Sequence, residues 1–284
     1  MAEEQPVATY VAGKPDLLLG NYDLAPLGYQ VEEYFVAGTA TSYYTLRGEA
    51  TADGRWDAHP ADTASYHTRI VVVRPTDPAT FNGTVAVEWL NVTGGLDVPV
   101  QWTTVHRELT RSGYIYVGVS VQKMGVDGVS GFLVGGAQPR GLKITNAQRY
   151  GDLSHPGDAF SFDIFSGIGR LLKTNPGQVL GPLAPKQVLG MGQSQSAHYL
   201  STYVNAIDPS VAIYDGFLIH GRGGGSVGID GEAATSLGAS PVRFRPDLRV
   251  PVITVLAESD LLGLMDPSAG YWAARVPDND RLRV

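Results

Sequence analysis

Ser194 is the first candidate for chemistry in this chain, because small residues surround it. It lies in Gly192-Gln193-Ser194-Gln195-Ser196, after the apolar run Val188-Leu189-Gly190-Met191 and before a segment with helical spacing. A backbone that turns sharply from a strand into a helix needs small neighbours, and it holds the hydroxyl where a base can reach it. Other Gly-x-Ser matches, such as Gly224-Gly225-Ser226, do not lie between an apolar run and a helix. The pattern predicts a nucleophile at Ser194, although a serine that only caps the helix has the same spacing.

A serine that attacks a carbonyl group needs backbone N–H groups aimed at the negative charge that develops on the carbonyl oxygen. After such a turn, the residue that follows the serine supplies one N–H, here Gln195, and the loop after the third strand supplies another. The corresponding loop follows the apolar run from Val85 to Leu90, and its glycines would let the backbone approach a ligand. An ordinary strand-to-helix turn explains this loop equally well. The residues expected at this oxyanion site are Asn91, Thr93, Gly94 and Gly95.

The acid that would assist the serine is expected after a later strand. Asp260 follows the apolar run from Val252 to Leu256, and Glu258 lies two residues earlier and could take its place. A carboxylate in this position orients a histidine and stabilises its cation. A solvated loop acid is the alternative for both residues.

No histidine lies at the place in the chain where the catalytic base is expected. The chain order should be serine, acid, histidine, but all six histidines precede Asp260: His59, His67, His106, His155, His198 and His220. His220 is the best substitute, because it ends the strand expected beside the one that leads to Ser194. His155 is expected to border the same edge, at the substrate. His198, four residues after Ser194, favours a packing or surface role, and a structural role is the simpler interpretation for all three.

Apolar runs alternate with helical segments along the chain. Strands are predicted over 69–73, 85–90, 114–119, 186–191, 212–219 and 252–256, with helices over 102–111, 159–172 and from Ser194 to Pro209. Residues 30–44 indicate a strand pair or a bent strand, and 48–63 a surface loop. This alternation predicts an α/β fold with a mostly parallel sheet, helices on both faces, and ligands beyond the carboxyl ends of the strands. We expect one domain over 1–284, with 122–158 and 220–248 as candidates for a small lid.

The composition excludes several classes of function. The net charge is −7 and no block of Lys or Arg is present, which argues against nucleic acid as a partner. The absence of cysteine excludes disulfides, thiolate metal sites and a cysteine nucleophile. No apolar run approaches the roughly 20 residues of a membrane span. We therefore expect a soluble protein, either cytoplasmic or secreted after removal of a leader, without nucleic acid as a partner and without a membrane span.

Six segments, in matching order over most of the chain, resemble a poorly characterised family of α/β-hydrolase domain proteins. They are Glu32-Glu33-Tyr34-Phe35-Val36, Phe81-Asn82-Gly83-Thr84-Val85, Val87-Glu88-Trp89-Leu90-Asn91-Val92-Thr93-Gly94-Gly95, Leu153-Ser154-His155-Pro156-Gly157-Asp158, Gly192-Gln193-Ser194-Gln195-Ser196 and Tyr214-Asp215-Gly216-Phe217. The resemblance implies the α/β-hydrolase fold and a serine hydrolase, with a carboxylesterase as the expected type and Ser194 as its nucleophile. The expected substrate is a small-molecule ester, and this chemistry needs no metal or organic cofactor.

The resemblance also implies where the histidine should be. Chains of this family continue past the equivalent of Val284 into a strand and then a loop that carries the catalytic histidine. We therefore expect either a chain cut short, one piece of a split protein, or another base. Two functions follow: an esterase that acts through a covalent acyl-enzyme, and a non-catalytic small-molecule binding protein of the same fold.

The two functions predict different results when the chain is extended by its downstream coding sequence. An esterase whose histidine follows Val284 gains hydrolysis of p-nitrophenyl acetate on extension, because without a general base only binding and the oxyanion site contribute. The measurement is the rate of p-nitrophenolate release by the printed and the extended chains. Negligible activity of both would support the binding protein, and equal high activity would place the base within 1–284.

Overall fold

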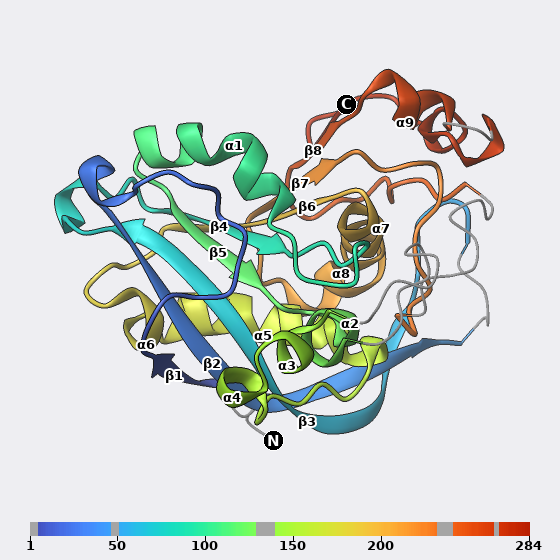
Figure 1. The fold of residues 1–284 in the computed structure, drawn as a ribbon. Coiled ribbons are helices and arrows are strands. Elements are labelled where there is room, and N and C mark those ends of the chain that lie inside the picture. The colour runs from blue at the N-terminus through green and yellow to red at the C-terminus, as the bar shows by residue number, and fades with distance from the viewer. Residues whose placement is uncertain (1–4, 47–50, 129–139, 232–240, 264–266) are drawn as a thin grey trace.

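A sheet of nine strands runs through the part of the chain that the structure describes, which is residues 5–46, 51–128, 140–231, 241–263 and 267–284 of a computed structural model (Figure 1). The strand order across the sheet is β1-β2-β3-β5-β4-β6-β7-β8-β9. The strands are β1 Val7–Val11, β2 Tyr29–Thr45, β3 Ala58–Pro75, β4 Thr84–Trp89, β5 Ile115–Val119, β6 Gln187–Gln193, β7 Gly216–His220, β8 Val252–Val255 and β9 Leu282–Arg283.

The sheet has an antiparallel part and a parallel part. Strands β1, β2 and β3 pair antiparallel, and β3 joins β5 antiparallel. From β5 through β4, β6, β7 and β8 to β9, every pairing is parallel. Because parallel neighbours end at the same edge, the residues that follow β4, β6, β7 and β8 meet there.

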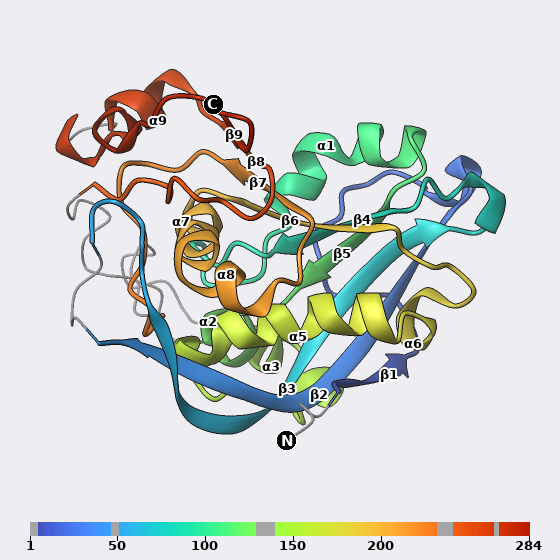
Figure 2. The same ribbon diagram turned by 180° about the vertical axis from the view of Figure 1, so that it is seen from behind.

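Helices cover both faces of the parallel part. Figures 1 and 2 show α1 (Val100–Arg111) on one face and α5 (Ser161–Thr174) on the other. Helix α7 (Gln195–Thr202) packs on β6 and β7 and shares the core of α5. The short helices are α2 Lys123–Asp127, α3 Leu142–Thr145, α4 Ala147–Tyr150, α6 Gly177–Leu180, α8 Asp208–Val211 and α9 Glu258–Leu262. A π-helical segment spans Tyr203–Ile207, and 3₁₀ turns span Ala25–Leu27, Pro78–Thr80, Asp158–Phe160, Pro267–Ala269 and Tyr271–Ala274.

Alternation along β4 divides the core into two layers. Val85, Val87 and Trp89 are fully buried on the side of α5 and α7. Ala86 faces the opposite layer, which includes Trp102 of α1. Both faces of this strand are therefore covered, which is why its sequence is a continuous apolar run broken by a single charge, Glu88.

Most elements lie where the sequence predicts them, and the mostly parallel sheet with helices on both faces is confirmed. Residues 30–44 form one strand with a register shift between Thr41 and Tyr43, rather than a strand pair. The loop predicted over 48–63 is wrong for 58–63, which belong to β3 and pair with the end of β2. These residues are mostly exposed, so this part of the strand carries no apolar alternation.

Glu88 caps the N-terminus of α1 from inside the sheet. Its Oε1 accepts from the Gln101 N–H at 2.7 Å, and its Oε2 accepts from the Trp102 N–H at 3.0 Å and the Tyr116 hydroxyl at 2.8 Å. The first N–H groups of a helix have no partner within it, so a buried carboxylate here satisfies donors that would otherwise be orphaned. Burial nevertheless raises the pKa of Glu88 to about 7.

Glu88→Ala is expected to lower the free energy of unfolding by about 2–4 kcal/mol, because two buried N–H groups and a buried hydroxyl lose their acceptor. Urea unfolding followed by circular dichroism measures this change. The control is Glu108→Ala near the other end of α1, where the carboxylate bonds the exposed Arg111 and Ser112. Similar losses in the two variants would mean that the contacts of Glu88 contribute little.

Candidate functional site

Ser194 occupies a strained turn between β6 and α7. Its φ of 56° and ψ of −118° lie outside the regions that residues other than glycine normally adopt, and such conformations cost about 1–3 kcal/mol. The Ser194 N–H donates to the carbonyl of His220 at 2.9 Å, which ties the turn to the end of β7. Ser194 occupies the N-cap position of α7, but its side chain makes no capping hydrogen bond. Capping therefore does not account for the serine side chain.

Two glycines lie beside the turn. A Cβ on Gly192 would lie 3.0 Å from Leu200 Cδ1 and 3.0 Å from Ser196 Cβ, both on α7. Gly221, which follows β7, has φ +65°, and a Cβ there would lie 3.8 Å from the Ser194 nitrogen and 3.6 Å from Asp260 Oδ2. The positive φ is what favours glycine at Gly221, because both distances are ordinary van der Waals contacts.

The loop after β4 lies against this turn. The Asn91 side-chain amide donates to the Gln193 carbonyl at 3.0 Å, and the Val92 N–H donates to Gln195 Oε1 at 3.3 Å. The Thr93 N–H is held by Asn91 Oδ1 at 2.9 Å, and the Gly95 N–H by the Val92 carbonyl at 2.9 Å. Gln195, whose backbone N–H is expected at the oxyanion site, thus also fastens the loop through its side chain.

The two candidate acids lie on α9, beyond the end of β8. Asp260 is half-buried and Glu258 is exposed. Asp260 Oδ2 lies close to Gly221, which neighbours Ser194, and it accepts from the Ala257 N–H at 2.8 Å, at the start of its own helix. Asp260 is therefore near the turn at Ser194, and the exposed Glu258 has no described contact with that turn.

His155 and His198 are buried and bonded to the backbone through both ring nitrogens. His155 Nε2 lies 2.7 Å from the Val121 carbonyl, and its Nδ1 accepts from the Gly157 N–H at 3.2 Å. His198 Nδ1 lies 2.9 Å from the Gly225 carbonyl, and its Nε2 accepts from the Gly223 N–H at 3.4 Å. Burial lowers the pKa of both rings, to about 4 for His198, where the charge of Arg222 acts in the same direction.

His220 is half-buried and has a different environment. Its Nδ1 lies 3.4 Å from Gln101 Oε1, an oxygen that can only accept, so Nδ1 carries the proton in this contact. No hydrogen bond in the described part of the chain involves His220 Nε2, and none joins the Ser194 hydroxyl to a histidine. The backbone of His220 therefore contacts Ser194, while its ring bonds to Gln101 of α1.

Comparison with known proteins identifies the family. A family model described as an alpha/beta hydrolase domain matches residues 3–284. The chain belongs to this α/β-hydrolase family. No curated protein sequence matches this α/β hydrolase.

Solved structures resemble this α/β hydrolase at low sequence identity. A zinc-bound cold-adapted esterase from an Arctic intertidal metagenomic library has 12% identity and a TM-score of 0.40, with 87% of this chain and 75% of that chain covered. A putative dienelactone hydrolase from Klebsiella pneumoniae has 12% identity and a TM-score of 0.35, with 78% and 71% covered. A lidless α/β serine hydrolase from Xanthomonas campestris has 12% identity and a TM-score of 0.41, with 81% and 76% covered. At this identity the likeness concerns the fold alone.

Arg222 is a residue near the site of this α/β hydrolase that sequence reasoning missed. Its fully buried guanidinium donates to the carbonyls of Gly223, Gly224, Gly225 and Val242, and it lies 4.7 Å from the Phe244 ring and 5.3 Å from the Tyr271 ring. Arg222 and His198 together hold the glycine-rich segment after β7. The only signal in the sequence was a single arginine within a glycine run.

The lid candidates 122–158 and 220–248 are described in part. Helices α2, α3 and α4 lie in the first, and residues 129–139 and 232–240 lie outside the described residues. A lid remains a prediction. Among the residues described, no helix combines the length and apolar character of a membrane span, and no cluster of three or more His, Asp or Glu side chains is arranged to hold a metal ion.

The neutral His198 is expected to make the stability of this α/β hydrolase depend on pH. Its pKa of about 4 in the folded protein lies below the value of about 6.5 in an unfolded chain. The unfolded state therefore binds a proton first, so stability is complete above pH 6.5 and is lost as the pH falls towards 4. His198→Gln removes the imidazole that takes up this proton on unfolding. The slope of unfolding free energy against pH between 6.5 and 4.5 should therefore fall by up to about 1.4 kcal/mol per pH unit. Urea unfolding at several pH values measures both slopes, and equal slopes would contradict a neutral buried His198.

Proposed function

We propose that this α/β hydrolase is a serine ester hydrolase that acts through a covalent acyl-enzyme on Ser194. The observation that carries the proposal is the strained backbone of Ser194, whose side chain does not cap the helix that it begins. Strain of this kind persists only where the surrounding structure enforces it, and it is common where a side chain must be presented to a substrate. Alternative structural roles for Ser194 do not require such a conformation.

The proposed reaction has two steps. Ser194 Oγ attacks the carbonyl carbon of the ester as a base removes its proton, and the tetrahedral intermediate collapses when the alcohol leaves with that proton. Water then attacks the acyl-enzyme with the help of the same base, which releases the acid and restores Ser194. The backbone N–H groups of Gln195 and Gly94 are assigned to the oxyanion, because the loop from Asn91 to Gly95 is fastened to the turn and, among the described contacts, the other N–H groups of that loop already donate within the protein.

His220 is the base that the described residues favour. With a proton on Nδ1, held by Gln101, its Nε2 is left to accept a proton. The backbone bond from Ser194 N–H to the His220 carbonyl keeps the two residues together. Asp260 is assigned as the acid because its Oδ2 lies close to Gly221, beside the turn at Ser194, and the exposed Glu258 is the less favoured alternative.

A non-catalytic binding protein is the second candidate, and one observation favours it. The Asp260 carboxylate bonds to the start of its own helix, while the His220 ring bonds to Gln101, so these two side chains are engaged with different partners. A binding protein of this fold would keep the turn without needing the acid and the histidine to meet.

Labelling with a fluorophosphonate probe distinguishes the two candidates. The wild type should be labelled and Ser194→Ala should fall to background, because the probe forms a covalent bond with an activated serine. The matched control is Ser196→Ala, in the same motif, whose buried hydroxyl has no hydrogen-bond partner. It should label like the wild type.

His220→Gln then tests the base. A labelling rate about 100-fold or more below that of the wild type would agree with general-base assistance by His220. Labelling at the wild-type rate would assign the base to another group. Equal labelling of Ser194→Ala and the wild type would reject Ser194 as the nucleophile, and a wild type that is neither labelled nor active on esters would favour the binding protein.

A further inference from the structure

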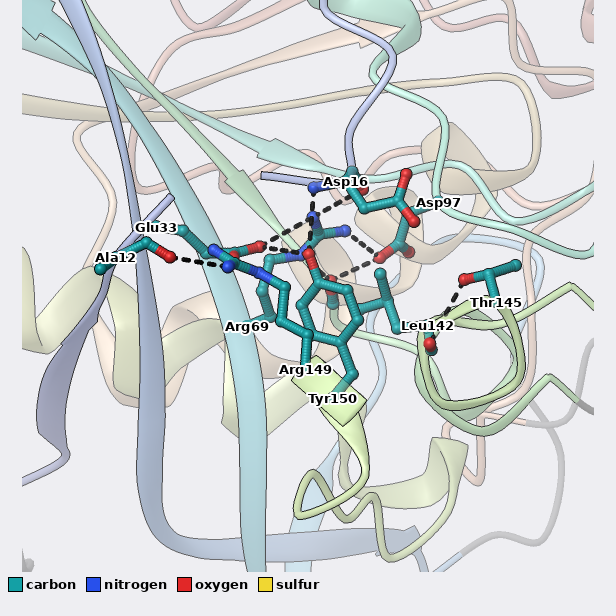
Figure 3. A network of polar contacts seen from close by, with 10 residues as sticks. Ala12, Asp16, Glu33, Arg69, Asp97, Leu142, Thr145, Arg149 and Tyr150 are labelled. Atoms are coloured by element: carbon teal, nitrogen blue, oxygen red, sulfur yellow. Dashed lines mark hydrogen bonds and ion pairs between the residues drawn. The ribbon is translucent and has the colours of Figure 1, made fainter. Parts of the chain in front are cut away.

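A buried cluster of charges lies behind the loop after β4. Arg69 of β3 is fully buried, and its Nη2 lies 2.7 Å from Asp97 Oδ2, while its Nη1 lies 3.5 Å from Glu33 Oε1 on β2. Figure 3 shows Arg69 between these two carboxylates. Asp97 is in the loop after β4, so one arm of the guanidinium holds that loop and the other holds the sheet.

The contacts of Arg69 leave it little freedom. Its Nε donates to the Ser120 hydroxyl at 2.9 Å, and that hydroxyl in turn donates to Asp97. Its Nη1 also donates to the Asp16 carbonyl at 3.1 Å. A planar guanidinium bonded on all three nitrogens is fixed in orientation, so the position of Asp97 is fixed as well.

The loop is held from its other side by the turn at Ser194. Asn91 and Val98 exchange two backbone hydrogen bonds, at 3.1 and 2.8 Å, which close the loop into a short ladder. Asn91 and Val92 are bonded to the residues on either side of Ser194. The loop therefore spans the distance between the charge cluster and the turn, with contacts at both ends.

We propose that Asp97 and Arg69 are positioning residues, which hold the loop from Asn91 to Gly95 at the distance from Ser194 that stabilises the oxyanion. This inference rests on the proposed function, because it assigns a role in the reaction of Ser194. Neither residue touches the substrate. An oxyanion site works only when its donors are fixed before the charge develops, so an anchor behind the loop affects the rate of the chemical step.

The proposal requires that substitutions of Asp97 and Glu33 have different effects on the loop after β4, although both carboxylates flank Arg69. Asp97→Asn weakens the anchor of the loop, whereas Glu33→Gln weakens the attachment of Arg69 and Arg149 to the strand β2. Both variants remove one buried carboxylate, so both should lower the melting temperature. Only Asp97→Asn should loosen the loop.

Gly125→Ala provides a second variant that leaves every charge in place. A Cβ on Gly125 of α2 would lie 2.1 Å from Asp97 Oδ1 and 3.2 Å from Val92 Cγ1, so it must displace the loop. Gly125 has no positive φ, and the substitution therefore imposes no backbone strain of its own on α2.

The test measures two quantities in the wild type and the three variants. Hydrogen–deuterium exchange over residues 90–99 reports the loop independently of activity, and the rate constant of phosphonylation by a fluorophosphonate reports the oxyanion site. Asp97→Asn and Gly125→Ala should both speed exchange in this segment and slow phosphonylation about 10- to 100-fold, with ester KM changed less than kcat. Glu33→Gln should stay within about 3-fold of the wild type in both quantities.

Three outcomes contradict the inference. Equal exchange in Asp97→Asn and Glu33→Gln would show that Asp97 does not anchor the loop. A loosened loop with an unchanged phosphonylation rate would show that the loop does not act on the reaction, while Ser194 remains the nucleophile. A wild type that is not phosphonylated would overturn the proposed function and this inference with it, whatever the exchange data show.

Discussion

The hydrogen bond from the Ser194 N–H to the His220 carbonyl holds together the end of the sheet on which the site is built. It joins the ends of β6 and β7, and it closes a turn that a serine would not adopt in a free chain. The energy for that strain comes from the buried strands on either side, which fix where both ends of the bond lie. Gly192 leaves room for α7 beside the turn, and Gly221 adopts the positive φ at which the chain leaves β7.

The site is a product of strand order as much as of residue type. Asp260, the loop after β4 and His220 are distant from Ser194 in the chain, and they lie at one edge of the sheet because β4, β6, β7 and β8 end there. The same order explains why the loop after β4 can be fastened to residues on both sides of Ser194. Each connection carries one part of the site, and the parallel strands supply the frame.

Strands buried on both faces could be predicted from the sequence, because a strand covered on both sides carries a continuous run of apolar residues. The turn at Ser194 was predictable because Gly192 lies between an apolar run and a segment of helical spacing, although the sequence could not separate a nucleophile from a helix cap. The outer half of β3 was not, since exposed residues such as Asp62 and Thr63 carry no periodic signal. Nor could the partners of Arg69 be foreseen, because Glu33, Asp97 and Ser120 are brought to it only by the completed sheet. The burial of His155 and His198, on which their roles depend, was likewise a property of the fold.

The charge cluster around Arg69 also bears on how the chain folds. Glu33 bonds to Arg149, 116 residues away in the chain, and Arg69 bonds to Asp97 and to the Asp16 carbonyl, which lies between β1 and β2. A partly folded chain that had formed β2 and β3 alone would contain a guanidinium and a carboxylate without most of their partners, and a buried charge without a partner is unfavourable. Contacts between such distant segments also form slowly, because a long loop must close first. The cluster therefore penalises half-formed states and makes the antiparallel strands, the loop after β4 and α4 cooperate in one folding unit.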